Sequence, residues 1–281
     1  MSGRSGDKRP SNRSNRGPSR GGPSGGRSSS GGGGRRDDRS SRSGPSRGGS
    51  GPSKGGGGSR PSAADRKKLH AGGQLPKWVR EEILRATPKE RRDAAIRELE
   101  SGVEAFAAGR FKQAAGSLRR AKAATSRVAT IRELLGLSAY QMGNWDEALK
   151  ELRAFRRMSG ETDQMPVEMD CLRALGRSKD VDKTYSLFQE LGGGRDSDNE
   201  ARVVYASHLL DEGRLEEAWK IVKPGRLIEN PPASLVRRWA VAARVANAAN
   251  DREAVSTFLG AIRNDDPETP WLEDLERELG I

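Results

Sequence analysis

The chain has 281 residues, of which 51 are Lys or Arg and 39 are Asp or Glu, and its formal net charge is +12. One cysteine and two histidines are too few for an internal disulfide framework or a cysteine-rich zinc site. No run of about 18 apolar residues suggests a membrane-spanning helix, and no apolar stretch follows the first basic residues as in a secretory signal, so we expect a cytoplasmic protein.

Residues 1–62 differ in composition from the rest of the chain. They hold 14 Lys and Arg, 3 Asp and a single apolar side chain, Met1, so they carry +11 of the total charge. Because such a segment can bury almost no apolar surface, we expect a disordered basic tail rich in Gly, Ser, Arg and Pro. Its arginines could neutralise RNA or DNA phosphates, but no aromatic side chain is present to stack on bases, and a merely solubilising tail is the alternative. The candidate nucleic-acid residues, which include the arginines of two Arg-Gly-Gly blocks, are Arg20, Arg27, Arg35, Arg36 and Arg47.

Residues 63–90 are predicted to form a junction and a capping helix. Pro76 is suited to a helix start, and Trp78, Val79, Ile83 and Leu84 follow it as a sparse apolar face. His70 lies among polar residues and is interpreted as an incidental surface histidine.

From Ser62 onward, apolar residues recur at helical spacing, and strand patterns are almost absent, so the sequence predicts an all-α fold. Thr87 and Glu90 have the spacing of a capping box, and Ser197 and Asn144 stand at similar helix starts. The last helix, within residues 269–281, is expected to begin at Pro270, to end before Gly280 and to cap the preceding helices.

The main pattern in this region is a repeat. Gly109, Gly143, Gly176 and Gly213 are 34, 33 and 37 residues apart, and Ala249 occupies the glycine position of a weaker fifth copy. A mostly small residue follows five positions later and a larger apolar residue four positions after that; these pairs are Ala114 and Leu118, Ala148 and Leu152, Val181 and Tyr185, Ala218 and Val222, and Ala254 and Phe258. Periods of this length predict a helical-hairpin unit that buries its apolar face only by stacking on its neighbours.

The chain resembles the tetratricopeptide repeat (TPR) family over residues 91–266, most closely at residues 135–148 and 213–218. The resemblance implies a solenoid of about five helix pairs, at about 95–128, 129–161, 162–198, 199–234 and 235–268. Met169 and Ser178 depart from the family pattern in the third copy, and three glycines at 192–194 lengthen the loop before the fourth. An irregular helical bundle with accidental glycine spacing is the alternative.

No enzyme signature is found. Cys171 and His208 are the only candidates for a nucleophile and base, but the repeat places them in equivalent positions of adjacent helices about 8–10 Å apart, so we interpret both as packing residues. The glycines at 192–194 lack the Gly-Lys-Ser/Thr ending of a phosphate loop. We therefore expect no catalytic residue, no cofactor and no metal.

The TPR resemblance further implies a concave groove lined by the first helix of each pair. Its candidate residues, copy by copy, are Leu99, Val103 and Phe106; Glu133, Leu137 and Tyr140; Asp170 and Arg173; Val203, Ser207 and Leu210; and Trp239 and Ala243. Because these residues lack clustered Lys, Arg and Asn, we do not expect chaperone C-terminal tails to bind. A helix or an extended segment with an apolar anchor is the expected ligand, although the aromatic members could simply pack between helices.

We therefore predict a non-enzymatic protein–protein interaction scaffold with an unidentified protein or peptide as partner. The alternative is a nucleic-acid or ribonucleoprotein factor whose tail binds RNA or DNA while the helices recruit a protein. A third possibility is that the tail folds over Asp170 and inhibits binding. Arginine outnumbers lysine 38 to 13, a composition that suits a high-GC bacterial genome.

Overall fold

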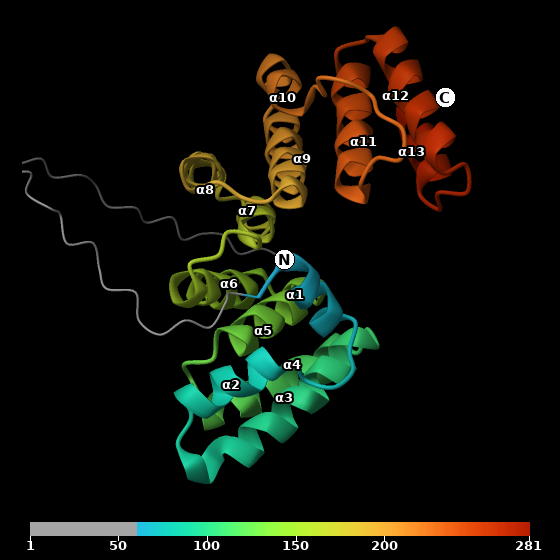
Figure 1. The fold of residues 1–281 in the computed structure, drawn as a ribbon. Helices are drawn as coiled ribbons and strands as arrows, with labels where there is room; N and C mark the ends of the chain where they lie inside the picture. The colour runs from blue at the N-terminus through green and yellow to red at the C-terminus, as the bar shows by residue number, and fades with distance from the viewer. Residues whose placement is uncertain (1–60) are drawn as a thin grey trace, which may run out of the picture. The chain divides into compact units, whose positions relative to one another are not determined.

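The computed structural model describes residues 61–281, apart from the side chain of Ala63. Over that range the regular secondary structure is all helical, with no strand, which confirms the predicted all-α class (Figure 1). The predictions for residues 1–60, including the five candidate nucleic-acid arginines, lie outside the described residues.

Thirteen α-helices make up the described region. Their bounds are α1 Ala63–His70, α2 Lys77–Ala86, α3 Arg92–Ala107, α4 Phe111–Ala124, α5 Ala129–Gln141, α6 Trp145–Ser159, α7 Met165–Ala174, α8 Ser178–Leu191, α9 Arg195–Asp211, α10 Leu215–Val222, α11 Ala233–Ala248, α12 Arg252–Asp265 and α13 Leu272–Leu279.

Helices α3 to α12 pack as five consecutive pairs, and each pair also contacts the next. In the first four pairs the turn contains the predicted glycine in the left-handed conformation, with φ between 66° and 73° at Gly109, Gly143, Gly176 and Gly213. A side chain is strained in this conformation. The glycine spacing therefore predicted these four turns correctly.

The fifth pair follows the same pattern but one residue later than predicted. The left-handed residue is Asn250, with φ of 60°, and not Ala249. Asparagine tolerates this conformation better than other residues with a side chain. The buried residues that follow at the repeat spacing are accordingly Val255 and Leu259, in place of the predicted pair Ala254 and Phe258.

Small residues let the two helices of a pair approach closely. A methyl group added to Gly136 on α5 would lie 2.7 Å from Cγ of Leu152 on α6, and one added to Gly102 on α3 would lie 2.7 Å from Cγ of Leu118 on α4. Both distances are well below van der Waals contact, so these helix pairs depend on glycine.

Several predicted helix starts differ from the structure. Thr87 follows the end of α2 and its hydroxyl has no hydrogen-bond partner, because a 3₁₀ turn at Lys89–Arg91 precedes α3 and no capping box forms. Ser197 lies inside α9, which already begins at Arg195. Asn144 does stand before α6, but its side chain makes no capping bond.

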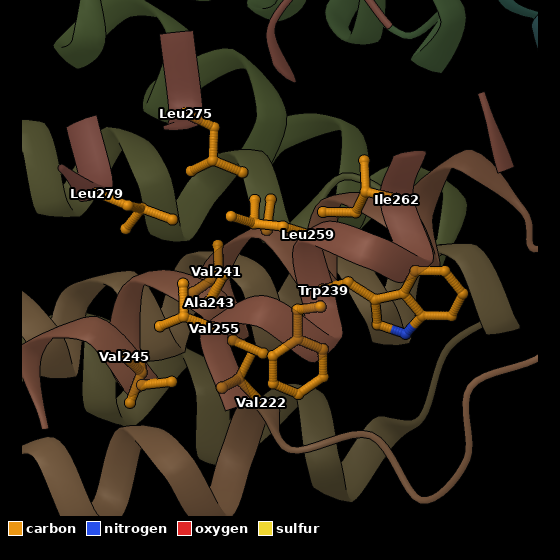
Figure 2. Packing of buried hydrophobic residues seen from close by; sticks show 14 of the residues in the cluster. Val222, Trp239, Val241, Ala243, Val245, Val255, Leu259, Ile262, Leu275 and Leu279 are labelled. Carbon is orange, nitrogen blue, oxygen red and sulfur yellow. The ribbon is translucent and has the colours of Figure 1, made fainter. Parts of the chain in front are cut away.

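The two end helices pack apolar residues against their neighbours, but α2 buries only part of its predicted apolar face. Leu272, Leu275 and Leu279 of α13 are buried in the cluster formed with α11 and α12 (Figure 2), and Gly280 ends the helix in the left-handed conformation. This helix begins two residues after the predicted Pro270. In α2, Val79 and Ile83 are buried, whereas Leu84, predicted on the same face, is 45% exposed.

Candidate protein-binding groove

A groove with a volume of about 800 Å³ runs along the first helices of successive pairs. It is lined by Arg66, Lys67, His70, Tyr140, Asp163, Gln164, Pro166, Val167, Asp170, Gly194, Arg195, Asp196, Ser197, Glu200, Val204, Pro232, Ala233, Ser234 and Arg237. These residues come from α1, α5, α7, α9 and α11 and from the loops that precede α7, α9 and α11. The groove is therefore built from the repeat.

Equivalent residues form two rows along the groove. Asp163, Glu200 and Arg237 are 37 residues apart in the chain and make a charged row, in which Arg237 forms an ion pair with Glu200. Val167 and Val204, also 37 residues apart, are half-buried and add an apolar row beside it. The groove thus offers apolar surface flanked by charges of both signs.

Asp196 anchors the wall between α1, α9 and α11. Its carboxylate accepts from Lys67 Nζ at 3.1 Å and from Ser234 Oγ at 2.9 Å. Hydrogen bonding to Lys67, and then to Ser234, lowers the pKa of Asp196 below its ordinary value, so this carboxylate is ionised at neutral pH.

Tyr140 and Asp170 form a polar contact on the groove wall. The Tyr140 hydroxyl donates to Asp170 Oδ2 at 2.5 Å, and Arg173 bridges Asp170 and Asp211 at 3.0 and 2.9 Å. Burial, reinforced by the hydrogen bond to the carboxylate, raises the pKa of Tyr140 well above its ordinary value. The phenol is therefore neutral and acts as a fixed donor.

Arg66 of α1 closes the end of the groove next to α5. Its guanidinium lies 2.5 Å from Glu133 Oε2 and 2.5 Å from Glu161 Oε1. His70, predicted to be an incidental surface residue, is half-buried, lies 3.7 Å from Glu133 Oε1 and packs against the ring of Phe106. Helix α1 is thus held in place by charged groups of other helices.

The buried carboxylates near Arg66 have opposite pKa shifts. Burial acts to raise the pKa of Glu133, but the neighbouring His70 imidazole and the charge of Arg66 outweigh it and hold the pKa below its ordinary value. For Glu161, burial dominates over its bond to Arg66 and raises the pKa.

The predicted groove residues divide into three groups. Tyr140 and Asp170 do line the groove. Leu99, Val103, Trp239 and Ala243 are buried in the core and offer no surface to a partner, which corrects their placement. Glu133 is also buried, but it contacts α1.

The remaining predicted residues lie outside the groove lining. Phe106 packs against Phe111, and Ser207 donates to the Val203 carbonyl. Arg173 is exposed and forms ion pairs with Asp170 and Asp211. The other predicted residues outside the groove lining are half-buried: Phe106, Leu137, Val203, Ser207 and Leu210.

None of the five residues of the charged row and the apolar row was among the predicted groove residues. On α9 the lining residue is Val204 and not its neighbour Val203, a difference of about 100° around the helix. The error on α11 has a further cause, since the fifth copy was aligned one residue early. The 37-residue spacing of Asp163, Glu200 and Arg237 is a signal that could have identified the charged row.

The groups considered for chemistry are buried. Cys171 and His208 are both inaccessible, and burial, aided by the nearby Asp170 and Glu168, raises the pKa of the Cys171 thiol to about 12. Within residues 61–281 no group of three or more His, Cys, Asp or Glu could hold a metal ion. The helices of this described region include none with the length and apolar character needed to cross a membrane.

The sequence matches no protein-family model and no curated protein.

Proposed function

We propose that this chain is a non-enzymatic protein-binding scaffold of the TPR type, and that the groove along α5, α7, α9 and α11 holds a segment of its partner. The observation that carries the proposal is the groove itself, in which equivalent positions of successive helix pairs supply a charged row and an apolar row. The five pairs, with left-handed turn residues 34, 33, 37 and 37 residues apart, support a TPR-like solenoid.

The groove favours a peptide over a small molecule. It extends over several helices, and its polar groups belong to both signs of charge. A helix or extended segment could place an apolar anchor between Val167 and Val204 while its polar side chains meet Glu200 and Arg237. Because Tyr140 and Asp196 are already held by hydrogen bonds, this surface is ordered before the partner arrives, which reduces the entropy lost on binding.

The proposal is tested by blocking the groove in the full chain. Ala233 is an exposed groove residue at the start of α11, so Ala233→Arg places a long side chain in the groove without disturbing the core. Ala123→Arg makes the same change at an exposed position of α4, which does not line the groove. Both variants should unfold at temperatures close to that of the wild type.

Wild type and variants are used to recover proteins from a lysate of the source organism, with and without nuclease. We expect Ala233→Arg to lose proteins that both the wild type and Ala123→Arg retain after nuclease treatment. If all three chains recover the same proteins, the groove is not the binding site. If recovery from the wild type requires intact nucleic acid, the alternative of a nucleic-acid-tethered factor is favoured.

A further inference from the structure

Glu133 is a buried carboxylate at a repeat position where other helix pairs carry apolar side chains. The equivalent residues, at the repeat spacings of 34, 33 and 37, are Leu99, Pro166 and Val203. The side chain of Glu133 is 0% exposed. An unpaired buried carboxylate is strongly unfavourable, so stacking of the helix pairs does not explain an acid at this position.

The carboxylate is one wall of a site that encloses a guanidinium group. Glu133 lies on α5 and Glu161 on the loop between α6 and α7, and both contact Arg66 at 2.5 Å. The Arg66 guanidinium carbon lies 4.9 Å from the ring centroid of Phe155 and 5.5 Å from that of Trp78. Two carboxylates with two aromatic faces form a favourable environment for arginine. We call Glu133, Glu161, Phe155 and Trp78 the arginine cage.

All four cage residues belong to the body of the described region, and only the guanidinium comes from α1. Gln164 Nε2 also donates to Glu133 Oε1 at 2.9 Å and so orients the carboxylate. Arg66 does not use the site fully, because its buried Nε has no hydrogen-bond partner. Glu133 is thus oriented by a residue that would remain if α1 departed.

Beyond Arg66, helix α1 is attached by three of its described side chains. Leu69 is buried, His70 is half-buried against Phe106 and lies 3.7 Å from Glu133 Oε1, and Lys67 meets Asp196 at the exposed surface. Gly72 and Gly73 follow the helix with φ of 88° and 103°, a pair of residues whose backbone is unusually permissive. Rotation of the backbone at these two glycines would move the eight-residue helix without unfolding α2.

Helix α1 and the open groove are continuous. Arg66, Lys67 and His70 border the same cavity as the residues of α7, α9 and α11. Removal of α1 would widen the groove beside α5, uncover the carboxylates of Glu133 and Glu161, and free the exposed carboxylate of Asp196 from Lys67. This combination of acids is complementary to a segment with an arginine and a second basic side chain, which is the chemistry that α1 itself presents.

We propose that the arginine cage is a ligand-binding site of the groove, that Arg66 fills it in the structure described here, and that the partner segment inserts an arginine of its own in exchange for α1. This inference rests on the proposed function, because it specifies the chemistry of the partner that the groove accepts. Helix α1 then acts as an intramolecular competitor that sets the affinity for the partner.

The proposal is tested with the full chain and a peptide of known chemistry. The probe is a fluorescent, end-blocked peptide with the sequence of residues 62–71, together with the same peptide carrying neutral, isosteric citrulline in place of arginine. Leu69→Ala weakens the attachment of α1 but leaves the cage intact. Leu279→Ala is the matched control, since Leu279 is a buried leucine near the end of another eight-residue terminal helix, α13.

We expect Leu69→Ala to bind the arginine peptide about tenfold or more tightly than the wild type, because the cage is free for a larger fraction of the time, and Leu279→Ala to bind like the wild type. Citrulline in the peptide should weaken binding to Leu69→Ala about tenfold, since charged hydrogen bonds are lost. Adding Glu133→Gln to Leu69→Ala should remove most of the preference for arginine. Fluorescence anisotropy measures all these affinities. Leu69→Ala is used in place of Arg66→Ala because emptying the cage could unfold the chain, whereas Leu69→Ala keeps Arg66 and all four cage residues.

Equal binding of the arginine and citrulline peptides, or equal binding by Leu69→Ala and Leu279→Ala, would overturn the proposal. If Ala233→Arg nevertheless abolishes partner recovery, the groove function stands and only the arginine site is rejected. If Leu69→Ala dimerises in light-scattering measurements and no longer accepts peptide, the occupant is α1 of a second copy, and the proposal of a separate partner is wrong.

Discussion

Replacing Gly136 with alanine tests how closely α5 and α6 must approach. The added methyl carbon would lie 2.7 Å from both Cγ and Cδ2 of Leu152 and 3.2 Å from the Leu152 backbone nitrogen. Carbon atoms normally approach to about 3.5 Å, so the overlap with Leu152 is severe. Leu152 is completely buried and has no solvent to move into, and the contact with its backbone means that α6 itself must shift.

Two opposing effects set the magnitude for Gly136→Ala. Alanine favours a helix over glycine by about 1 kcal/mol, whereas overpacking a core costs about 1–3 kcal/mol. Because both a side chain and the backbone obstruct the new methyl group, we expect the cost at the upper end of that range and a net loss of about 1–2 kcal/mol in the free energy of unfolding.

Two further glycines provide the comparison. A methyl group at Gly116 on α4 would meet only the end of Arg120 at 3.8 Å, so Gly116→Ala should stabilise the chain by about 0.5–1 kcal/mol. Gly102→Ala should fall between the two, because it meets the side chain of Leu118 but not its backbone.

Urea unfolding followed by circular dichroism measures this order in the full chain. The expected ranking of stability is Gly116→Ala above Gly102→Ala above Gly136→Ala. If Gly136→Ala proves as stable as Gly116→Ala, then the helices repack freely and close approach is not what requires glycine.

Three other predictions concern charge, turns and tyrosines. Glu151 is buried and accepts hydrogen bonds from Lys122 at 2.6 Å and from Arg132 at 2.7 Å. Burial acts to raise the pKa of Glu151, but these bonds outweigh it and hold the pKa below its ordinary value. A lowered pKa in the folded state adds stability above the unfolded pKa of about 4.3, and this added stability is lost as the pH falls through the folded pKa. Glu151→Gln should therefore cost about 1.5–3 kcal/mol at pH 7 and less near pH 3 in thermal unfolding, and an equal cost at both pH values would contradict this. Gly143 has a φ of 72°, so Gly143→Ala should lower the free energy of unfolding by about 1–2 kcal/mol in urea unfolding, and Gly143→Asn should lower it by less. Equal stability of the two variants would count against the requirement for a left-handed residue at this turn. Burial is the leading cause that raises the pKa of all three tyrosines, that of Tyr205 to about 12. Absorbance at 295 nm should therefore show less phenolate at pH 10 in the folded chain than in the unfolded chain, and equal ionisation in the two states would refute the assignment.

The helix pairs could be predicted because their signals are local. A left-handed turn nearly requires glycine, and the spacing of Gly109, Gly143, Gly176 and Gly213 therefore located four turns in the sequence. The fifth turn has Asn250 in place of glycine, because asparagine also tolerates this conformation. With no glycine to mark the turn, the prediction placed it one residue early, at Ala249. That slip moved every prediction on α11 by one position.

The groove was harder to predict because its residues are selected by the packing of separate helices. The pattern of apolar residues shows that one face of α9 is buried, but it does not distinguish Val203 from Val204, which differ in whether they line the groove. Helix α1 was missed for another reason. Its capping box, in which Ser62 and Asp65 bond reciprocally, stands at the boundary of a glycine-rich segment and precedes only one apolar residue that becomes buried, Leu69.

A comparison of two buried carboxylates explains why the sequence could not separate a structural acid from a binding one. Glu151 and Glu133 are both almost completely buried and both accept from cationic side chains. The partners of Glu151 lie on α4 and α5, which are adjacent to its own helix in the stack, so this acid fixes neighbouring helix pairs and its loss should reduce stability.

Glu133 differs in the position of its partner along the chain. Arg66 is 67 residues away, on a helix attached to the rest by a pair of glycines. Under the proposal above, the ion pair of Glu133 opens while the helix pairs remain folded, whereas the partners of Glu151 lie on helices of the packed stack. Because the two acids have the same chemistry, only the topology distinguishes them: removal of Glu151 should alter unfolding, and removal of Glu133 should alter the choice between arginine and citrulline. If removal of Glu133, like removal of Glu151, changed the stability of the chain but not its preference for arginine over citrulline, α1 would be a permanent part of the fold.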